Sequence, residues 1–241
     1  MNPKDVQVLG LDAGTGSWDI VSFVDDEVRV EFSMPTVKVV ANPHIIVRTL
    51  LRFRDYDLIP LPLGYGFPVT KVQKLTDENI KQITLHPSIH EKPDFETVLR
   101  ELRRTNLNAV TIPSVKHLPT VPSWRKINRI DLGTPDKVCV AAWAIRAQAN
   151  RRGIPFERTS FILVEVGLGF TAVLGVQNGC IVDGVGGTMG PMGLRSMGDL
   201  DGEVAALMRS IDKAKVYGSG ASTILNRPLG GLSELLQAAE S

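Results

Sequence analysis

The stretch that decides the fold is Leu11-Asp12-Ala13-Gly14-Thr15-Gly16-Ser17, near the N-terminus. It follows the apolar run Val6 to Leu11, which predicts a buried strand, and a second apolar run, Ile20 to Val24, comes after it. Asp25-Asp26 then predicts a turn, and Val28 to Phe32 alternates like a third strand. The unit is therefore strand, glycine loop, strand, tight turn, strand.

The same unit recurs in the second half of the chain. Its parts are, in order, the strand Phe161 to Val166, the glycine loop Gly167-Leu168-Gly169-Phe170, the strand Thr171 to Val176, the turn Asn178-Gly179 and the strand Cys180 to Val182. A shift of about 153 positions places Asp12 on Glu165, Gly14 on Gly167, Gly16 on Gly169 and Asp26 on Gly179. This register indicates an internal repeat. The alternative is that two hairpins with glycine turns look alike without being related.

Mixed α/β sequence surrounds the two copies. Helices are predicted from Thr76 to about Ile83, from Asp94 through Leu102, from Thr134 to Arg152 and from Asp201 to Ile211, and strands over 108–112 and 214–217. A short helix is predicted near Leu232 to Ala238. The boundary falls near residue 155, so that residues 1–155 form an N-terminal domain and residues 156–241 a shortened C-terminal domain, each with one glycine loop.

The glycine loops are suited to bind phosphate. A strand that runs into such a loop and straight back out forms a hairpin whose tip exposes backbone N–H groups. The glycines of Gly14-Thr15-Gly16-Ser17 allow the backbone to approach a phosphate closely, and its threonine and serine add hydroxyl donors. Asp12, at the strand end, could hold Mg²⁺ or its water shell. The second loop, with Gly167 and Gly169, would bind the same triphosphate from the other side. A hairpin with a purely structural role is the alternative.

The composition excludes several classes of protein. Charged residues make up 22% and hydrophobic residues 43% of the 241 positions, which is ordinary for a globular enzyme. The 27 Lys and Arg nearly balance the 26 Asp and Glu, without the basic excess of a nucleic-acid binder. The two cysteines, Cys139 and Cys180, form no C-x-x-C pattern, and no uncharged stretch predicts a membrane helix. We expect a cytoplasmic protein with neither a nucleic-acid partner nor a membrane.

The motifs together resemble a known superfamily. Leu11 to Ser17 is similar to the first phosphate motif of acetate and sugar kinases, heat-shock chaperones and actin, and Glu165 to Gly169 is similar to the second. Thr188 to Asp201, which contains Arg195, resembles a stretch of acetate and butyrate kinases. The segments that resemble, more narrowly, an archaeal family labelled "predicted butyrate kinase" are Pro113-Ser114-Val115, Leu118 to Pro122 and Gly133 to Lys137.

This resemblance implies an α/β fold of two ribonuclease-H-like domains, the actin-like ATPase fold, with a nucleotide cleft between them. It implies ATP and Mg²⁺ as cofactors, with the glycine loops on the phosphates and Asp12 orienting the metal. Arg195 matches the arginine that steadies the transferring phosphoryl group in acetate kinases. Asp183 is a further candidate for the metal, and a plain turn residue is the alternative.

The chain departs from acetate kinases in three places. Those enzymes carry Asn where this chain has Asp12, which is closer to sugar kinases. Their motif ending His-Gly-Thr-Ser-His matches only Gly133-Thr134-Pro135-Asp136, without either histidine. Their adenosine-binding part is reduced to Val216 through Ala221, so Gly218 and Gly220 form either an adenosine loop or an ordinary turn.

The prediction is an ATP-dependent phosphotransferase of the acetate or butyrate kinase type, with a short carboxylate as acceptor. Asp136, at a helix start, is either an acid favoured by the helix dipole or the general base of a kinase for a hydroxylated molecule. A third alternative is a nucleotide-binding switch or assembly protein with little or no turnover. The acceptor and a homodimeric state are left open.

Overall fold

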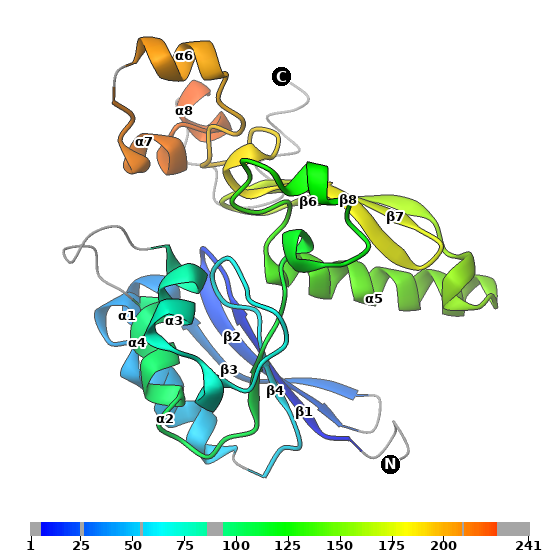
Figure 1. The fold of residues 1–241 in the computed structure, drawn as a ribbon. Coiled ribbons are helices and arrows are strands. Elements are labelled where there is room, and N and C mark those ends of the chain that lie inside the picture. The colour runs from blue at the N-terminus through cyan, green and yellow to red at the C-terminus, as the bar shows by residue number, and fades with distance from the viewer. Residues whose placement is uncertain (1–5, 25–26, 54, 86–93, 209, 226–241) are drawn as a thin grey trace. The chain divides into compact units, whose positions relative to one another are not determined.

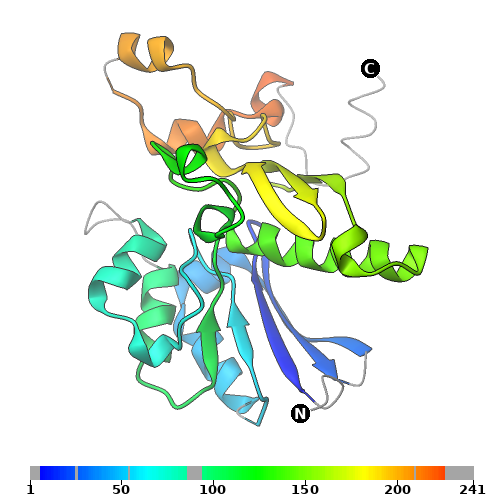
Figure 2. The same ribbon diagram turned by 45° about the vertical axis from the view of Figure 1, so that its right-hand side comes forward.

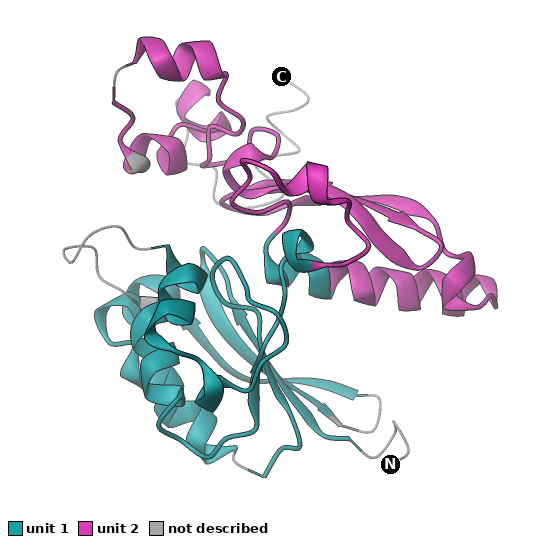
Figure 3. Ribbon diagram, in the orientation of Figure 1, with its two compact units in different colours: residues 1–117, 134–139 teal, residues 118–133, 140–241 magenta. Residues whose placement is uncertain are grey.

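The structure is a computed structural model that describes residues 6–24, 27–53, 55–85, 94–208 and 210–225. Its contacts divide the chain into two compact units, which are coloured separately in Figure 3. Unit 1 comprises residues 1–117 and 134–139, and unit 2 comprises residues 118–133 and 140–241. The domain boundary near residue 155 stays a prediction.

Unit 1 combines a mixed set of strands with helices (Figure 1). Its elements are β1 (Val8–Ala13), β2 (Ser17–Val24), β3 (Glu27–Pro35), α1 (Thr36–Ala41), α2 (His44–Arg52), β4 (Ile59–Leu61), α3 (Asp77–Thr84), α4 (Asp94–Leu102) and β5 (Ala109–Thr111). The first three strands form an antiparallel sheet in the order β1-β2-β3, and β4 pairs with β5 in parallel. Strand β4 also lies beside β1, because the N–H of Leu9 donates to the carbonyl oxygen of Leu58 (3.0 Å).

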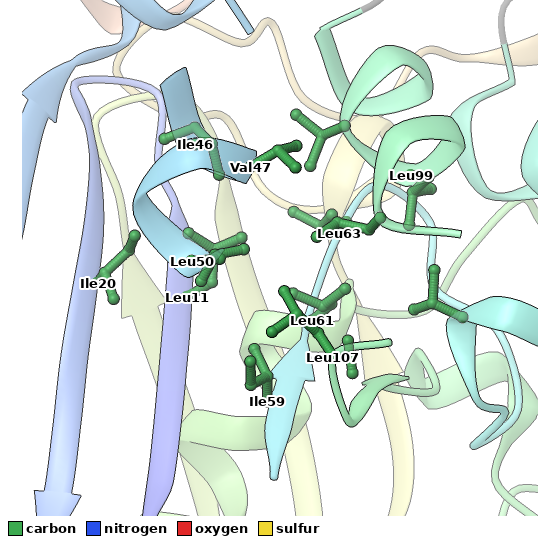
Figure 4. Packing of buried hydrophobic residues seen from close by; sticks show 14 of the residues in the cluster. Leu11, Ile20, Ile46, Val47, Leu50, Ile59, Leu61, Leu63, Leu99 and Leu107 are labelled. Atoms are coloured by element: carbon green, nitrogen blue, oxygen red, sulfur yellow. The ribbon is translucent and has the colours of Figure 1, made fainter. Parts of the chain in front are cut away.

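The core of unit 1 lies between this sheet and its helices. Leu9 and Leu11 of β1 are only 0% and 3% exposed, and they share a buried cluster with Ile46 and Leu50 of α2. Figure 4 shows these two residues of α2 beside Leu11 and Ile20. Burying one such side chain contributes roughly 1.5–3 kcal/mol. The apolar stripe of α2 therefore holds the helix on the face of the sheet that carries Leu9 and Leu11.

Unit 2 contains a second antiparallel sheet, in the order β6-β7-β8. Its elements are β6 (Phe161–Val166), β7 (Thr171–Gln177), β8 (Cys180–Val185), α6 (Gly202–Leu207), α7 (Lys213–Gly218) and α8 (Ala221–Ile224). Helix α5 (Pro135–Arg152) begins in unit 1 and continues in unit 2, where it lies along one face of this sheet (Figures 1 and 2). Short 3-10 helices lie at Val72–Lys74, Val115–His117, Ser123–Lys126, Phe156–Arg158 and Gly187–Met189.

The pairing register confirms the internal repeat. The outermost and innermost pairs of β1 and β2 are Val8 with Phe23 and Ala13 with Trp18, and those of β6 and β7 are Phe161 with Val176 and Val166 with Thr171. Each pair is displaced from its counterpart by the shift found in the sequence. Asn178 and Gly179 both have positive φ (51° and 73°), as the predicted two-residue hairpin requires. The counterpart of this turn, Asp25-Asp26, lies outside the described residues.

One predicted element is wrong and another is too long. The strand predicted over 214–217 lies in helix α7. The carboxylate of Asp212 accepts the N–H of Ala214 (2.9 Å), and this N-cap favours a helix. The helix predicted to reach Ile211 ends at Leu207, and the one predicted near Leu232 to Ala238 lies outside the described residues. Among the helices that the structure describes, none has both the length and the apolarity needed to cross a membrane.

Candidate functional site

The first glycine loop joins β1 to β2 in unit 1. The N–H of Gly14 donates to the carbonyl oxygen of Ser17 (2.9 Å), which closes the turn. Thr36 uses the two loop carbonyls: its hydroxyl donates to Gly14 (2.7 Å) and its N–H donates to Gly16 (3.0 Å). The N–H groups of Thr15 and Gly16, in contrast, have no acceptor among the described residues. Donors left open at an exposed hairpin tip are suited to bind an anion.

Asp12 faces a second carboxylate across this hairpin. The register pairs Asp12 with Asp19, so both side chains lie on one face of the sheet with Cβ atoms about 4.5–5.5 Å apart. Like charges in this position repel each other, and a bound divalent cation would offset that repulsion. The Asp19 carboxylate also accepts the hydroxyl of Ser17 (2.7 Å), which links it to the loop. This donor set fits Mg²⁺, which takes one or two protein carboxylates and fills its other positions with water and phosphate oxygens.

Asp136 lies in the first turn of α5, in the part of that helix that belongs to unit 1. Its carboxylate pairs with Nζ of Lys137 (2.8 Å). Cys139 keeps an exposed surface, but partial desolvation of its thiol, together with the negative charges of Asp136 and Asp12, raises the pKa of that thiol to about 11. Because the charges of Asp136 and Asp12 both raise the pKa of this thiol, these two predicted site residues lie in one region of unit 1.

The second glycine loop joins β6 to β7 in unit 2 and has the same closure as the first. The N–H of Gly167 donates to the carbonyl oxygen of Phe170 (3.0 Å). The carbonyl of Gly169 accepts the N–H of Ser196 (3.0 Å), a residue that follows the third strand of its sheet, as Thr36 does in unit 1. Here too, within the part of the chain that the structure describes, the N–H groups of Leu168 and Gly169 have no acceptor. The repeat has therefore kept the closing hydrogen bond and the unbonded N–H groups of the loop as well as a strand order.

Glycines let three backbone segments of unit 2 pack against one another. A Cβ on Gly193 would lie 2.4 Å from the carbonyl oxygen of Gly169, and one on Gly220 would lie 2.5 Å from that of Gly193. The N–H of Gly220 donates to the carbonyl of Arg195 (2.7 Å), and that of Ala221 donates to Gly193 (3.0 Å). The predicted adenosine loop therefore contacts the segment of Arg195, and that segment contacts the second glycine loop.

An aromatic pair adds to this packing. The rings of Phe170 and Tyr217 meet edge to face with their centroids 5.1 Å apart, which connects the second glycine loop to the end of α7. Gly218, which follows Tyr217, has open space where a Cβ would be, so no close approach explains a glycine there. Of the two glycines predicted to bind adenosine, only Gly220 has a packing role.

Arg195 is held by its backbone. Its N–H donates to the carbonyl of Gly169 (3.4 Å), and its own carbonyl accepts the N–H of Gly220. The side chain is exposed and has no hydrogen-bond or ion-pair partner among the residues described. A guanidinium fixed at its base beside a glycine loop, with its charge uncommitted, can pair with an anionic ligand.

Asp183 carries a partner already. Nε of Arg125 lies 2.8 and 2.9 Å from its two carboxylate oxygens, and the N–H of Gly184 donates to one of them (2.8 Å). A metal ion at Asp183 would have to compete with this guanidinium, so the metal role of Asp183 stays a prediction that the ion pair opposes. Over the described ranges, no group of three His, Cys, Asp or Glu is placed to hold a metal ion.

Asp19, Thr36 and Gly193 contact the loops but were not among the predicted site residues. Asp19 could have been found by counting, because a turn closed between Gly14 and Ser17 sets it opposite Asp12. Thr36 and Gly193 reach the loops only after the chain has folded back past a third strand. Their roles depend on tertiary contacts, for which sequence spacing gives no signal.

Solved structures define the class to which this fold belongs. The chain is similar to an acetate kinase from Entamoeba histolytica, with a TM-score of 0.59 and 13% identity over 90% of this chain and 67% of that one. It is also similar to a propionate kinase from Francisella tularensis, with a TM-score of 0.53 and 14% identity over 96% of this chain and 67% of that one. The predicted fold class, the α/β actin-like ATPase fold of acetate kinases, is therefore confirmed.

The chain belongs to the family described as "Protein of unknown function (DUF1464)", whose model matches residues 10–240. None of the curated proteins compared with the chain matches it.

Proposed function

We propose that this protein is an ATP-dependent phosphotransferase that moves the γ-phosphoryl group of ATP to a small carboxylate. The observation that carries the proposal is the pair of glycine loops, one in each unit, with the same closing hydrogen bond and with open N–H groups at the tip. Each loop would contribute backbone N–H groups to the phosphates of a nucleotide. The fold shared with an acetate kinase and a propionate kinase supports this proposal.

Each group in the two loops would have a distinct task. The tip N–H groups of Thr15 and Gly16, and those of Leu168 and Gly169, would bind phosphate oxygens. Asp12, with Asp19 across the hairpin, would hold Mg²⁺. An ion held there would neutralise part of the negative charge of the phosphates.

The proposed transfer needs charge stabilisation and no proton acceptor. An oxygen of the acceptor carboxylate forms a bond to the γ-phosphorus, and the bond from that phosphorus to the oxygen of the leaving ADP breaks, which gives an acyl phosphate. The acceptor is already ionised at neutral pH, so no base has to remove a proton. Arg195 would pair with the oxygens of the transferring group, a kind of interaction worth about 10²–10³ in rate.

A second candidate is a kinase for a hydroxylated small molecule, and the position of Asp136 favours it. A hydroxyl acceptor benefits from a base that takes its proton, and Asp136 shares a region of unit 1 with Asp12. The ion pair with Lys137 occupies one oxygen of this carboxylate. We rank this candidate second because of Arg195, whose side chain pairs with none of the described residues. Its positive charge suits a reaction in which both the phosphoryl donor and the acceptor are anions.

The test is ADP release from Mg·ATP with a panel of acceptors: acetate, propionate, butyrate and several polyols. Butyrate belongs in the panel because of the resemblance to the archaeal family labelled "predicted butyrate kinase". The proposal expects stimulation by a short carboxylate and a product that hydroxylamine traps as a hydroxamate. Stimulation by polyols alone would establish the second candidate. Nucleotide binding without turnover for any acceptor would favour a switch or assembly protein.

A further inference from the structure

His117 ends the short 3-10 helix that follows β5 in unit 1, and its ring is tied back to the start of that helix. Nδ1 of His117 lies 2.9 Å from the hydroxyl oxygen of Ser114 and accepts the backbone N–H of the same serine (3.2 Å). Ser114 is 0% exposed, whereas His117 is an exposed residue. The ring is therefore fixed to a buried residue although the histidine itself remains accessible to a ligand.

This contact decides which nitrogen of the neutral ring carries the proton. A backbone N–H can only donate, so Nδ1 of His117 is the unprotonated acceptor. The neutral ring then carries its proton on Nε2, and Nε2–H is a hydrogen-bond donor. A carboxylate only accepts hydrogen bonds, so it is a suitable ligand for this donor.

The topology of unit 1 places His117 at the same edge of the sheet as the first glycine loop. Strands β1 and β4 run parallel, with Val8 beside Leu58, and β4 pairs with β5 in parallel (Figure 1). The carboxyl ends of parallel strands lie at one edge, and α/β proteins bind their ligands outside that edge. Asp12 lies at the carboxyl end of β1, and His117 follows the carboxyl end of β5.

Gly66, in the loop after β4, brings the start of α5 to this region. Its φ is +73°, and a Cβ there would lie 2.7 Å from the backbone nitrogen of Ser114 and 2.6 Å from Cγ of Pro135. Pro135 is the first residue of α5. The backbone of Gly66 is therefore packed between the turn that holds His117 and the first turn of α5.

Lys137 brings a positive charge to that first turn of α5. Its side chain is only 13% exposed, and its Nζ lies 2.8 Å from a carboxylate oxygen of Asp136. The ion pair is neutral overall, so the charge of Asp136 does not keep an anionic acceptor away.

We infer that His117 binds the acceptor carboxylate of the proposed reaction, with Nε2–H donating to one of its oxygens. The inference rests on the proposed function and adds to it the residue that holds the acceptor. Ser114 is the positioning residue, because its N–H fixes the ring and its tautomer. The acceptor would lie at the carboxyl edge of the unit 1 sheet, where Asp12 and the first glycine loop would hold Mg²⁺ and phosphate. His117 takes no proton, since the acceptor is already ionised.

Steady-state kinetics with the carboxylate that best stimulates ADP release give the first test. His117→Ala should raise the KM for this acceptor at least ~10-fold and leave the KM for ATP within about 2-fold, because it removes a hydrogen bond to a charged group. His117→Gln, whose amide N–H can take the place of Nε2–H, should restore the acceptor KM to within about 3-fold of wild type. The control is His44→Ala on α2, whose ring pairs with Glu101 and which should change neither KM.

A histidine that only closes its own turn would give other results. Equal increases in both KM values, no increase in either, or an acceptor KM in His117→Gln as high as in His117→Ala would overturn the inference. Thermal melts of the three variants show that each is folded under the assay conditions.

Nuclear magnetic resonance gives a reading that needs no turnover. The full chain is labelled with ¹⁵N in its four histidines, and the signals of His117 are those missing from His117→Gln. The inference expects the Nε2–H tautomer, and a shift of its Nε2 resonance on addition of acetate, propionate or butyrate, with and without Mg·ADP. The resonances of His44 should stay in place.

The two readings separate failure of this inference from failure of the proposed function. The Nδ1–H tautomer, or a His117 resonance that none of the three carboxylates moves, would overturn the inference even if a carboxylate stimulates ADP release. A shift at His117 without turnover for any acceptor would confirm the carboxylate site and end the proposed phosphotransfer.

Discussion

Unit 1 buries the face of its hairpin that carries Leu9 and Leu11, whereas unit 2 buries the face that carries Ala172 and Leu174. The two hairpins nevertheless keep the same register and the same closing bond at the glycine loop. The loop geometry therefore does not depend on which face of the sheet packs. It is set by local backbone bonds and by glycines, while packing sets the stability of each unit.

The largest expected effect is a difference between Asp12 and Glu165, the acidic residues at the same position of the two loops. Asp12 is exposed and faces Asp19, whereas Glu165 is half-buried and its counterpart across the hairpin is Ala172. Asp12→Ala should lower Mg²⁺-dependent turnover at least ~10³-fold and leave the thermal midpoint unchanged, because it removes the proposed metal ligand from a surface position. Glu165→Gln should lower the midpoint and change turnover by less than ~10-fold. Steady-state rates and thermal melts check both. Wild-type turnover in Asp12→Ala would end the phosphate-loop assignment.

A comparison of two arginines comes next. Arg195 is uncommitted among the described residues, whereas Arg125 pairs with Asp183. Arg195→Ala should lower kcat at least ~10²-fold with little change in nucleotide affinity, since it removes the charge proposed to act in the transition state. Arg125→Ala, as the matched control, should change kcat by less than ~10-fold. An effect of Arg195→Ala confined to KM would make this arginine a binding residue, and no effect would point to a switch protein.

The glycine contact of unit 2 predicts a stability effect. Gly193→Ala places a Cβ 2.4 Å from the carbonyl oxygen of Gly169, so we expect a loss of about 1–3 kcal/mol in the free energy of unfolding. Gly202→Ala is the control, because nothing lies within 4 Å of a Cβ there. Urea unfolding curves of both variants measure the difference. Equal stability of the two would mean that the segments of Gly169 and Gly193 are not packed as described.

The smallest effect concerns Asp136, on which the acceptor class depends. With a carboxylate acceptor, Asp136→Asn should keep at least about a tenth of wild-type turnover, because only a modest electrostatic contribution changes. The kcat of this variant with the preferred acceptor checks it. A loss of ~10³-fold or more, with unchanged folding and ATP affinity, would identify Asp136 as a general base and the acceptor as a hydroxyl.

Much of this fold could be predicted from local sequence. Strand β6 has the predicted bounds, because an apolar run followed by Gly-Leu-Gly is a signal that needs no tertiary contact. The prediction of a strand over 214–217 was wrong. It followed the alternating pattern of these residues, whereas the carboxylate of Asp212, just before them, caps a helix. The pair of Arg125 and Asp183 joins residues far apart in the chain, so no spacing could reveal it.

The same limit applies to the candidate site. The glycines of both loops could be predicted, since a hairpin tip needs them where they stand. Asp19 required the register of the hairpin, and the contact of Gly193 with Gly169 required the folded unit. The role of Arg195 rests on an uncommitted side chain, which only the structure can show.

The most direct test of the central claim is a calorimetric titration of the chain with Mg²⁺ and a non-hydrolysable ATP analogue. It is repeated on Gly14→Ala and on Gly167→Ala, which place a Cβ 2.9 Å from the carbonyl of Ser17 and 3.2 Å from that of Phe170. The account predicts one nucleotide per chain, and affinity weakened at least ~10-fold by either substitution, more by Gly14→Ala. Two independent sites, an effect of only one loop, or no binding would contradict it.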